Sequence, residues 1–566
     1  MNKRRRSIKL LTAVASISLI AAACGDDDDD DTATTDAPTE TTEAEGAAPE
    51  GSGGELIDGG TFVGDPPEHI DPALNTTLDA YQVINAMYDG LTDIDSSDPE
   101  NPEIVPHVAE SFEANDDASV WTFTIRDGMH FSDGEEILPS TFVRSWERAA
   151  NPETAGDYSY LIGSFIEGGQ EMLDGTADTI TGLVADDEAM TLTVTLSAPY
   201  SNFPAVAGFQ LFMPMPEGAG DDAADYENGE MVGNGPYMLA QPRTDEEIVL
   251  VKNPEWTGDY NGETWDNRLD QITFLTSADP DTTYNALAAG EVDTANIPPA
   301  RTAEAEADFG TTLDVSILGS YHFDFNDRAP EIGGPENLLL RQAISMAIDR
   351  EKINNDIYNG SRTTSTGITP EGIPGWIPDI CDYCAYDPEG AQAAFDEWTA
   401  AGNSQSAPLP IQFNSGAGHE DVVAIIVQNL AEVGIEAVPD PMESETYFSD
   451  LADGACVFCR TGWFADYPTY DNFMFDLYHT ASLGGNNHGF SNPEFDALVD
   501  EAKETVDPTE QGELFNQAEE ILLNTDTMAV PINWYRGDYA YDQEKITNFP
   551  QSNFGLIAWE QITLAS

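Results

Sequence analysis

The chain has 566 residues, 40% of them hydrophobic and 10% aromatic, so it is long enough for two or three domains and is not wholly disordered. Its formal net charge is −83. Residues 59–566 alone carry 91 acidic and 16 basic side chains, which argues against a nucleic-acid partner because phosphates would be repelled. Acid-rich surfaces are one adaptation to high salt, so we expect an acidic, halophilic protein; ordinary drift in surface composition is the alternative.

The first 23 residues have the pattern of a secretion signal. A basic start is followed by the apolar run Leu10–Ala23 and directly by Cys24. The segment Ile20–Cys24 resembles a bacterial lipobox, although Ala21 stands where leucine is usual. We expect a lipoprotein signal peptide over 1–23 and a lipid on Cys24, which would hold the protein at the outer face of the cytoplasmic membrane. A signal peptide without lipidation is the alternative.

Residues 24–54 have low complexity. Six aspartates stand in a row at 26–31, followed by Thr, Ala, Glu and Pro. Such a segment buries too little apolar surface to order itself, and its charges repel one another. We expect a disordered acidic tether between the lipid and the folded body.

Strands are predicted where apolar residues alternate with polar ones. Trp121–Ile125 and Leu192–Leu196 show this period of two, which is typical of half-buried strands. Glu247–Val251 and Ile272–Leu275 are short apolar runs of the kind found in buried strands.

Helices are predicted between and after these strands. One follows Pro335, a second runs through Val422–Val433 and ends at Gly434, and a third follows Asn492. Strands and helices alternate along the whole chain, which predicts an α/β architecture.

No catalytic motif stands out. The sequence has no nucleophile elbow, no zinc-protease motif, no phosphate loop and no dinucleotide-binding glycine pattern. The seven histidines lack metal-ligand spacing. We therefore expect a protein that is not an enzyme and that needs no cofactor and no metal.

The cysteines after Cys24 form two Cys-x-x-Cys pairs. These are Cys381 with Cys384 and Cys456 with Cys459. An exported protein meets an oxidising compartment, which favours disulfides, and four cysteines allow three connectivities. Structural zinc and free thiols are the alternatives.

A series of short motifs in a fixed order identifies a family. In chain order they are Tyr88–Leu91, Pro106–Phe112, Trp121–Gly128, Phe131–Gly134, Phe142–Trp146, Asn151–Pro152, Val232–Tyr237, Asn253–Pro254, Leu287–Asp293, Arg341–Arg350, Gly462–Pro468 and Asn492–Asp496. From about residue 60 to its end the chain resembles the peptide-binding substrate-binding proteins of ABC importers (extracellular solute-binding family 5). The resemblance is strongest to their oligopeptide-binding branch.

The resemblance implies a two-lobed periplasmic-binding-protein-like fold of type II, with an additional inserted subdomain in the first lobe. Its first-lobe core would take 55–91, 212–310 and 530–566, and the insertion 92–211. The second lobe would take 311–529. The lobes would close on the ligand by a hinge motion.

The resemblance also implies anchors for the charged ends of a peptide. Asp466 stands where the family binds the amino end, although it could instead cap the turn before Pro468. Arg460 matches a carboxylate-facing arginine, and a straight strand would place it on the same face as Asp466; a surface salt bridge is the alternative. His419 lies close to a matching histidine, or is a solvent-exposed residue at a helix start.

Other candidate contacts come from both lobes. Gly462, Trp463 and Phe464 could pair with the peptide main chain as an added strand. Thr76, Leu78 and Tyr158 match ligand-contacting stretches of the family, and Thr76 replaces its common acidic residue. Core packing is the alternative for Trp463 and Tyr158.

These features predict a lipid-anchored, extracytoplasmic monomer that captures short peptides between its lobes and delivers them to an ABC permease. The same fold could bind an oligosaccharide, a metal complex or an opine instead. It could also serve as a receptor for peptide signals.

Overall fold

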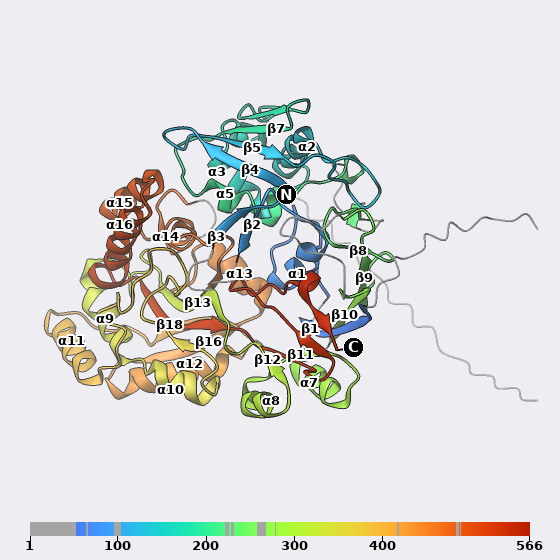
Figure 1. Cartoon of the computed structure of the whole chain (residues 1–566). Helices are drawn as coiled ribbons and strands as arrows, with labels where there is room; N and C mark the ends of the chain where they lie inside the picture. The colour runs from blue at the N-terminus through green and yellow to red at the C-terminus, as the bar shows by residue number, and fades with distance from the viewer. Residues whose placement is uncertain are drawn as a thin grey trace, which may run out of the picture. The chain divides into compact units, whose positions relative to one another are not determined.

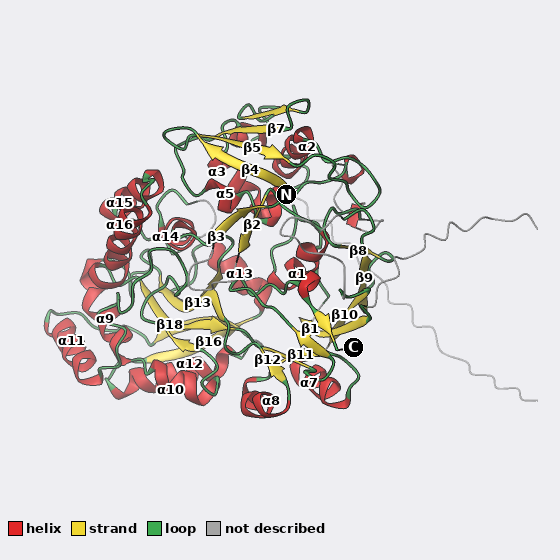
Figure 2. Cartoon of the chain, viewed as in Figure 1, coloured by secondary structure: helices red, strands yellow, loops and turns green. Residues whose placement is uncertain are grey.

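The computed structural model describes residues 53–565 except 64–65, 96–102, 221–225, 228–230, 257–267, 278, 416–417, 483–485 and 487. The predicted signal peptide, Cys24 and nearly all of the predicted tether lie outside the described residues. Helices and strands alternate along the chain, as the sequence pattern predicts (Figures 1 and 2). Within the described ranges, no helix has both the length and the apolar character needed to cross a membrane.

A seven-stranded mixed sheet forms the core of the first lobe, with the strand order β12-β19-β11-β1-β10-β9-β8. Figure 1 shows that it combines strands from the start, the middle and the end of the chain. The strands are β1 (Glu55–Val63), β8 (Tyr237–Leu239), β9 (Glu247–Lys252), β10 (Gln271–Ser277), β11 (Thr294–Asn296), β12 (Gly310–Thr311) and β19 (Tyr539–Tyr541). The helices of this part are α1 (Leu78–Met87), α7 (Pro280–Ala289) and α8 (Thr302–Asp308). The two predicted strands in this region are confirmed as parts of β9 and β10.

The inserted subdomain is built on an antiparallel sheet in the order β4-β5-β7-β6. Its strands are β4 (Ala109–Ala114), β5 (Val120–Ile125), β6 (Leu183–Asp186) and β7 (Thr191–Thr195), beside the hairpin β2 (Thr92–Asp95) and β3 (Glu103–Pro106). Its helices are α2 (Pro139–Ala150), α3 (Tyr160–Phe165), α4 (Gly169–Leu173) and α5 (Phe203–Val206). Both predicted alternating strands are confirmed, because their apolar residues share a buried cluster with Phe142 and Trp146 of α2.

The second lobe has a six-stranded sheet in the order β14-β18-β13-β17-β15-β16. Its strands are β13 (Ser316–Phe325), β14 (Thr363–Thr364), β15 (Leu409–Asn414), β16 (Ala437–Met442), β17 (Phe458–Phe464) and β18 (Ala529–Arg536). Its helices are α9 (Leu338–Ala347), α10 (Arg350–Ile357), α11 (Pro388–Ala400), α12 (His419–Glu432), α13 (Ser444–Ala452), α14 (Asp471–Tyr478), α15 (Pro493–Glu504) and α16 (Pro508–Glu520). Helices α10 and α12 lie along this sheet (Figure 2).

The three predicted helices are confirmed, with the ends that the sequence indicates. Asn492 caps α15 by accepting hydrogen bonds from the backbone N–H groups of Glu494 and Phe495. Gly434 follows α12 with a φ of +84°, a left-handed conformation that favours glycine.

The chain crosses between the lobes at two adjacent links, one between β12 and β13 and the other between β18 and β19. Because β18 pairs with β13 and β14, its residues belong to the second lobe. The predicted return to the first lobe at residue 530 is therefore wrong, and the crossing lies at Gly537 and Asp538, just before β19. The links bond to each other: the Gly537 N–H donates to the Val315 carbonyl (2.9 Å), and the Thr312 N–H to the Tyr539 carbonyl (3.0 Å).

Candidate functional site

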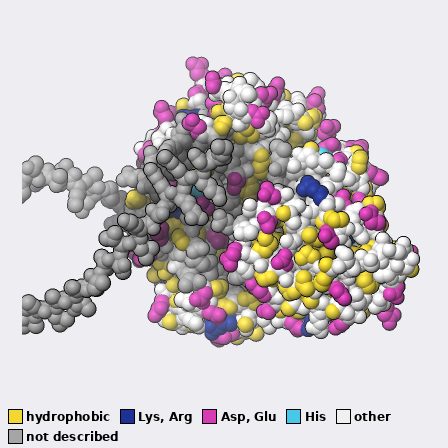
Figure 3. Space-filling model, turned by 180° about the vertical axis from the view of Figure 1, so that it is seen from behind, with side chains coloured by type: hydrophobic (Ala, Val, Ile, Leu, Met, Phe, Trp, Pro, Cys, Tyr) yellow, Lys and Arg dark blue, Asp and Glu magenta, His cyan; other side chains and the backbone are white. Residues whose placement is uncertain are grey.

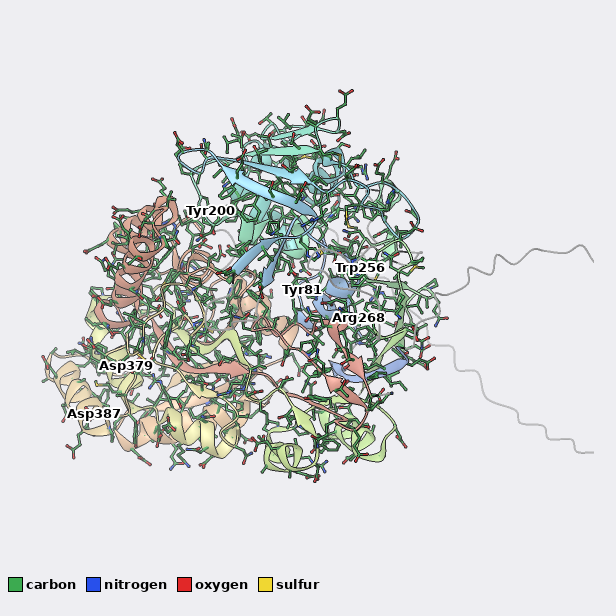
Figure 4. All side chains as sticks on the ribbon, viewed as in Figure 1. Tyr81, Tyr200, Trp256, Arg268, Asp379 and Asp387 are labelled. Atoms are coloured by element: carbon green, nitrogen blue, oxygen red, sulfur yellow. A yellow bond between two sulfur atoms is a disulfide. The ribbon has the colours of Figure 1, made fainter. Side chains whose placement is uncertain are left out.

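The inserted subdomain and the second lobe meet through buried polar contacts. The Tyr200 hydroxyl donates to the Asp471 carboxylate (2.7 Å), and Figure 4 shows Tyr200 on the side of the inserted subdomain that faces α14–α16. Tyr467 of the second lobe is fully buried within the core cluster of the inserted subdomain. Lys503 lies over the rings of Phe165 and Tyr200. These contacts bring the segment after β17 against the inserted subdomain.

Asp466 lies at this contact, two residues after the end of β17. Its carboxylate accepts hydrogen bonds from the Tyr158 hydroxyl (3.2 Å) and from the Asn472 amide (3.2 Å). The residue is half-buried, and the loss of hydration raises the pKa of its carboxyl group to about 7. No cationic side chain pairs with it among the described residues. A buried carboxylate without a counter-ion favours the arrival of a cation, such as a ligand ammonium.

Asn472 at the start of α14 positions this carboxylate, and the sequence reasoning missed it. Its fully buried amide oxygen accepts from the Trp463 indole N–H (3.0 Å) and from the Asp466 backbone N–H (3.0 Å). Its amide nitrogen also donates to Asp476 (2.9 Å), whose pKa burial raises to about 7, aided by the charge of Asp471. Only the short spacing to Asp466 could have pointed to Asn472.

The last residues of β17 have one open backbone edge. On one side, Gly462, Trp463 and Phe464 pair with β13 at Tyr321, Ser320 and Gly319. On the other side, β15 meets β17 only at Cys459, and no further described strand pairs there. The backbone edge of Gly462–Phe464 on that side thus has no strand partner among the described residues. Trp463 is half-buried against the second-lobe core, whereas Phe464 is 38% exposed.

Arg460 begins this edge and lies among aromatic rings. Its guanidinium is 5.0 Å from the ring centre of Tyr321, and its buried Nε has no hydrogen-bond partner in the described structure. No described carboxylate forms a salt bridge with it. The Tyr447 hydroxyl donates to its carbonyl group and fixes the backbone there.

His419, the first residue of α12, belongs to the same cluster. It is only 7% exposed, so the alternative of a solvent-exposed histidine is wrong. Its Nδ1 lies 3.1 Å from the Tyr321 hydroxyl. Burial lowers its pKa to about 3, helped by the positive charge of Arg460, so the imidazole is neutral at physiological pH.

Arg460 and Asp466 occupy separate clusters at the two ends of the open edge. The straight strand that would place them on one face is not formed, because β17 ends at Phe464 before Asp466 is reached. Asp466 contacts Tyr158 and Asn472, whereas the Arg460 guanidinium lies over Tyr321. A carboxylate at one end and a guanidinium at the other suit a ligand with opposite charges at its ends.

The first-lobe candidates lie near the start of α1. Thr76 is exposed and Leu78 half-buried, next to Thr77, which caps the helix. No described hydrogen bond joins Thr76 or Leu78 to the Asp466 cluster, so their ligand contacts stay predictions. Tyr81 of α1, labelled in Figure 4, lies nearer: burial raises its pKa, and the charges of Asp93 and Asp466 raise it further.

The cysteine pairs form two disulfides, Cys381–Cys384 and Cys456–Cys459. Sulfur atoms bonded to each other are not thiolate ligands, which contradicts the zinc alternative. The second disulfide lies directly before Arg460, beside the buried ring of Tyr447. Away from the site, a depression of about 250 Å³ between Pro330 and Leu409 contains none of the candidate ligand residues.

Comparison with known proteins identifies the family. The family model described as "Bacterial extracellular solute-binding proteins, family 5 Middle" matches residues 103–485. The chain belongs to this family. Its members are substrate-binding proteins of transporters that work outside the cytoplasm, not enzymes.

Curated relatives within solute-binding family 5 cover most of the chain. The periplasmic murein peptide-binding protein MppA of Escherichia coli is 27% identical over 482 residues, which are 83% of this chain and 86% of the relative. A probable deoxycholate-binding periplasmic protein of E. coli, YgiS, is 28% identical over 479 residues, 82% of this chain and 86% of the relative.

A solved structure shares the fold. The protein OppA of Burkholderia pseudomallei superposes with a TM-score of 0.75 at 24% identity, covering 91% of this chain and 100% of that one. The predicted two-lobed type II fold is confirmed. The predicted resemblance to family 5 is confirmed as well.

Proposed function

We propose that this protein captures short peptides between its lobes and delivers them to the membrane subunits of an ABC importer. The observation that carries the proposal is Asp466, a half-buried carboxylate without a cationic partner among the described residues, at one end of an open strand edge. Arg460 lies at the other end of that edge. A protein that accepts varied peptides must bind what all peptides share: an ammonium, a carboxylate and a regular backbone.

In this proposal each shared group of the peptide has its own partner. The α-ammonium pairs with Asp466, and the Tyr158 hydroxyl orients that carboxylate. The peptide backbone adds to Gly462–Phe464 as a strand. The terminal carboxylate faces Arg460, with the neutral His419 beside it as a hydrogen-bond partner. Thr76 and Leu78 border the ligand from the first lobe.

The location of the protein follows from its N-terminal sequence and its family. A lipid on Cys24 would hold the monomer at the outer face of the cytoplasmic membrane, and the acidic segment 24–54 would let the lobes reach the permease.

Native mass spectrometry of freshly purified mature protein, followed by sequencing of the released ligand, tests the proposal. We expect a mixture of short peptides with free amino ends. A single non-peptide solute in the cleft, or peptides blocked at the amino end, would overturn it.

A second candidate is a family 5 protein for a non-peptide solute. It is favoured by the deoxycholate-binding relative and by the rings of Phe464 and Tyr535, whose centres are 4.5 Å apart beside the open edge. Competition separates the two: free peptides displace the ligand that co-purifies with the protein only if the cleft is a peptide site.

A further inference from the structure

Basic side chains are scarce in this acidic protein, and most of them have a partner. Residues 59–566 contain 16 lysines and arginines, and Figure 3 shows acidic side chains spread over the visible face with few basic ones. Described salt bridges to Asp or Glu occupy Arg144, Arg148, Arg243, Lys252, Arg301, Lys352 and Lys545. Arg341, Arg350 and Arg536 donate to backbone carbonyls instead. Among the described residues, the guanidinium groups of Arg362 and Arg460 neither form a salt bridge with Asp or Glu nor donate to a backbone carbonyl.

Arg362 is held rigidly in the link between α10 and β14. Its backbone N–H and carbonyl both bond the side-chain amide of Asn354 (3.2 and 2.9 Å). Its guanidinium lies over two rings, 4.1 Å from the ring centre of Tyr535 and 5.0 Å from that of Tyr358. The Nη1 atom is buried and has no hydrogen-bond partner in the described structure. A guanidinium fixed in this way keeps its polar edge available to an anion.

Tyr535 joins Arg362 to Arg460. Its ring lies under the Arg362 guanidinium. A Cβ added to Gly462 would lie 3.1 Å from the Tyr535 hydroxyl oxygen and 3.2 Å from Nη2 of Arg460. The hydroxyl oxygen and Nη2 are therefore at most about 6 Å apart. The positive charges of both arginines also act on His419. Tyr535 thus lies beside both guanidinium groups.

A carboxylate that Arg362 influences is Asp538, at the second crossing between the lobes. The charge of Arg362 acts on Asp538, but burial dominates and raises the pKa of that carboxyl. Arg362 forms no salt bridge with Asp538 or with any other described carboxylate. One ligand carboxylate would neutralise one guanidinium and leave the other without a counter-charge.

We propose that Arg362 and Arg460 form an anion subsite for two carboxylates: the terminal carboxylate of a peptide and an acidic side chain from one of its last two residues. This inference rests on the proposed function and specifies its ligand. Arg460 takes the terminal carboxylate, and Arg362 takes the Asp or Glu side chain. The protein therefore prefers peptides with an acidic carboxyl end, despite its own negative charge.

Calorimetry with matched peptides tests the inference. The peptides are alanine di- to pentapeptides carrying Glu or Gln at the last or the penultimate position, titrated into mature wild type, R362Q and R301Q. Arg301 is the matched control because its guanidinium also lies over a tyrosine ring, 4.3 Å from that of Tyr284, outside the site. We expect wild type and R301Q to bind a Glu peptide roughly tenfold tighter than its Gln partner. We expect R362Q to bind both alike, at the affinity of wild type for the Gln peptide.

Three results would overturn the inference while peptide binding stands. In the first, wild type binds the Glu and Gln peptides equally. In the second, R362Q prefers the Glu peptide as strongly as wild type does. In the third, R362Q loses the same factor of affinity for both peptides. The last result would assign Arg362 to the terminal carboxylate. If wild type bound none of the peptides, the proposed function itself would fail.

Discussion

Replacing Asp466 by Asn is expected to stabilise the ligand-free protein while weakening peptide binding. Burial raises the pKa of Asp466 from 3.8 to about 7, so the folded state disfavours the ionised form. The stability of the wild type therefore falls as pH rises from about 4 to 7. A shift of this size corresponds to on the order of 2–4 kcal/mol once the group is ionised. The variant lacks this cost, so its ligand-free melting temperature exceeds that of wild type at pH 8 but not at pH 4.

Peptide affinity changes in the opposite direction. Loss of one partner of a buried ion pair costs about 3–5 kcal/mol, which is a hundredfold or more in the dissociation constant. Below pH 7 the wild type must first release the proton of Asp466, so its affinity falls by roughly tenfold per pH unit down to pH 5. Above about pH 8 the peptide ammonium itself deprotonates. The Asp466→Asn variant has no carboxylate to protonate, so its peptide affinity should not fall between pH 7 and pH 5.

Scanning calorimetry at pH 4 and 8 and titration calorimetry at pH 5–8 measure both effects. Asp127→Asn is the control, because Asp127 is exposed outside the site. An unchanged affinity would refute the anchor role of Asp466. A variant that lost affinity without gaining stability at pH 8 would refute the argument from burial.

Three further predictions concern the surroundings of the site. Tyr158→Phe removes a hydrogen bond to Asp466 and should weaken peptide binding several-fold, about 1 kcal/mol, by titration calorimetry; unchanged affinity would place Tyr158 outside the site. Gly537→Ala puts a Cβ 2.3 Å from the Thr312 carbonyl oxygen, so we expect a lower melting temperature and impaired ligand-induced compaction in X-ray scattering; wild-type behaviour in both would contradict a tight hinge there. Because the folded body repels itself, its melting temperature should rise from low to molar salt; a constant value would rule out salt adaptation.

Sequence patterns predicted two kinds of feature: strands that bury one face, and helix ends that are set by neighbouring residues. Alternation marked Trp121–Ile125 because its apolar side chains enter one core. Asn492 and Gly434 marked helix ends because capping and left-handed backbone are local properties. The order of motifs, rather than any physical pattern, pointed to the family and to Asp466.

The composition of the site could not be predicted in the same way. Arg362 and Tyr535 are far apart in the sequence and meet only because β14 pairs with β18. Asn472 looks like an ordinary polar residue near a helix start until the turn after β17 brings it to Asp466. Spacing alone could not relate Arg460 to Asp466, because the argument from a straight strand holds only if the strand continues, and β17 ends at Phe464.

The central claim is that Asp466 binds a peptide ammonium between the lobes. The most direct test is to compare the affinities of one peptide and its N-acetylated form for wild type and Asp466→Asn. We predict that acetylation weakens binding to wild type by a hundredfold or more and has little effect on the variant. Equal affinities of wild type for the free and the acetylated peptide would contradict the claim.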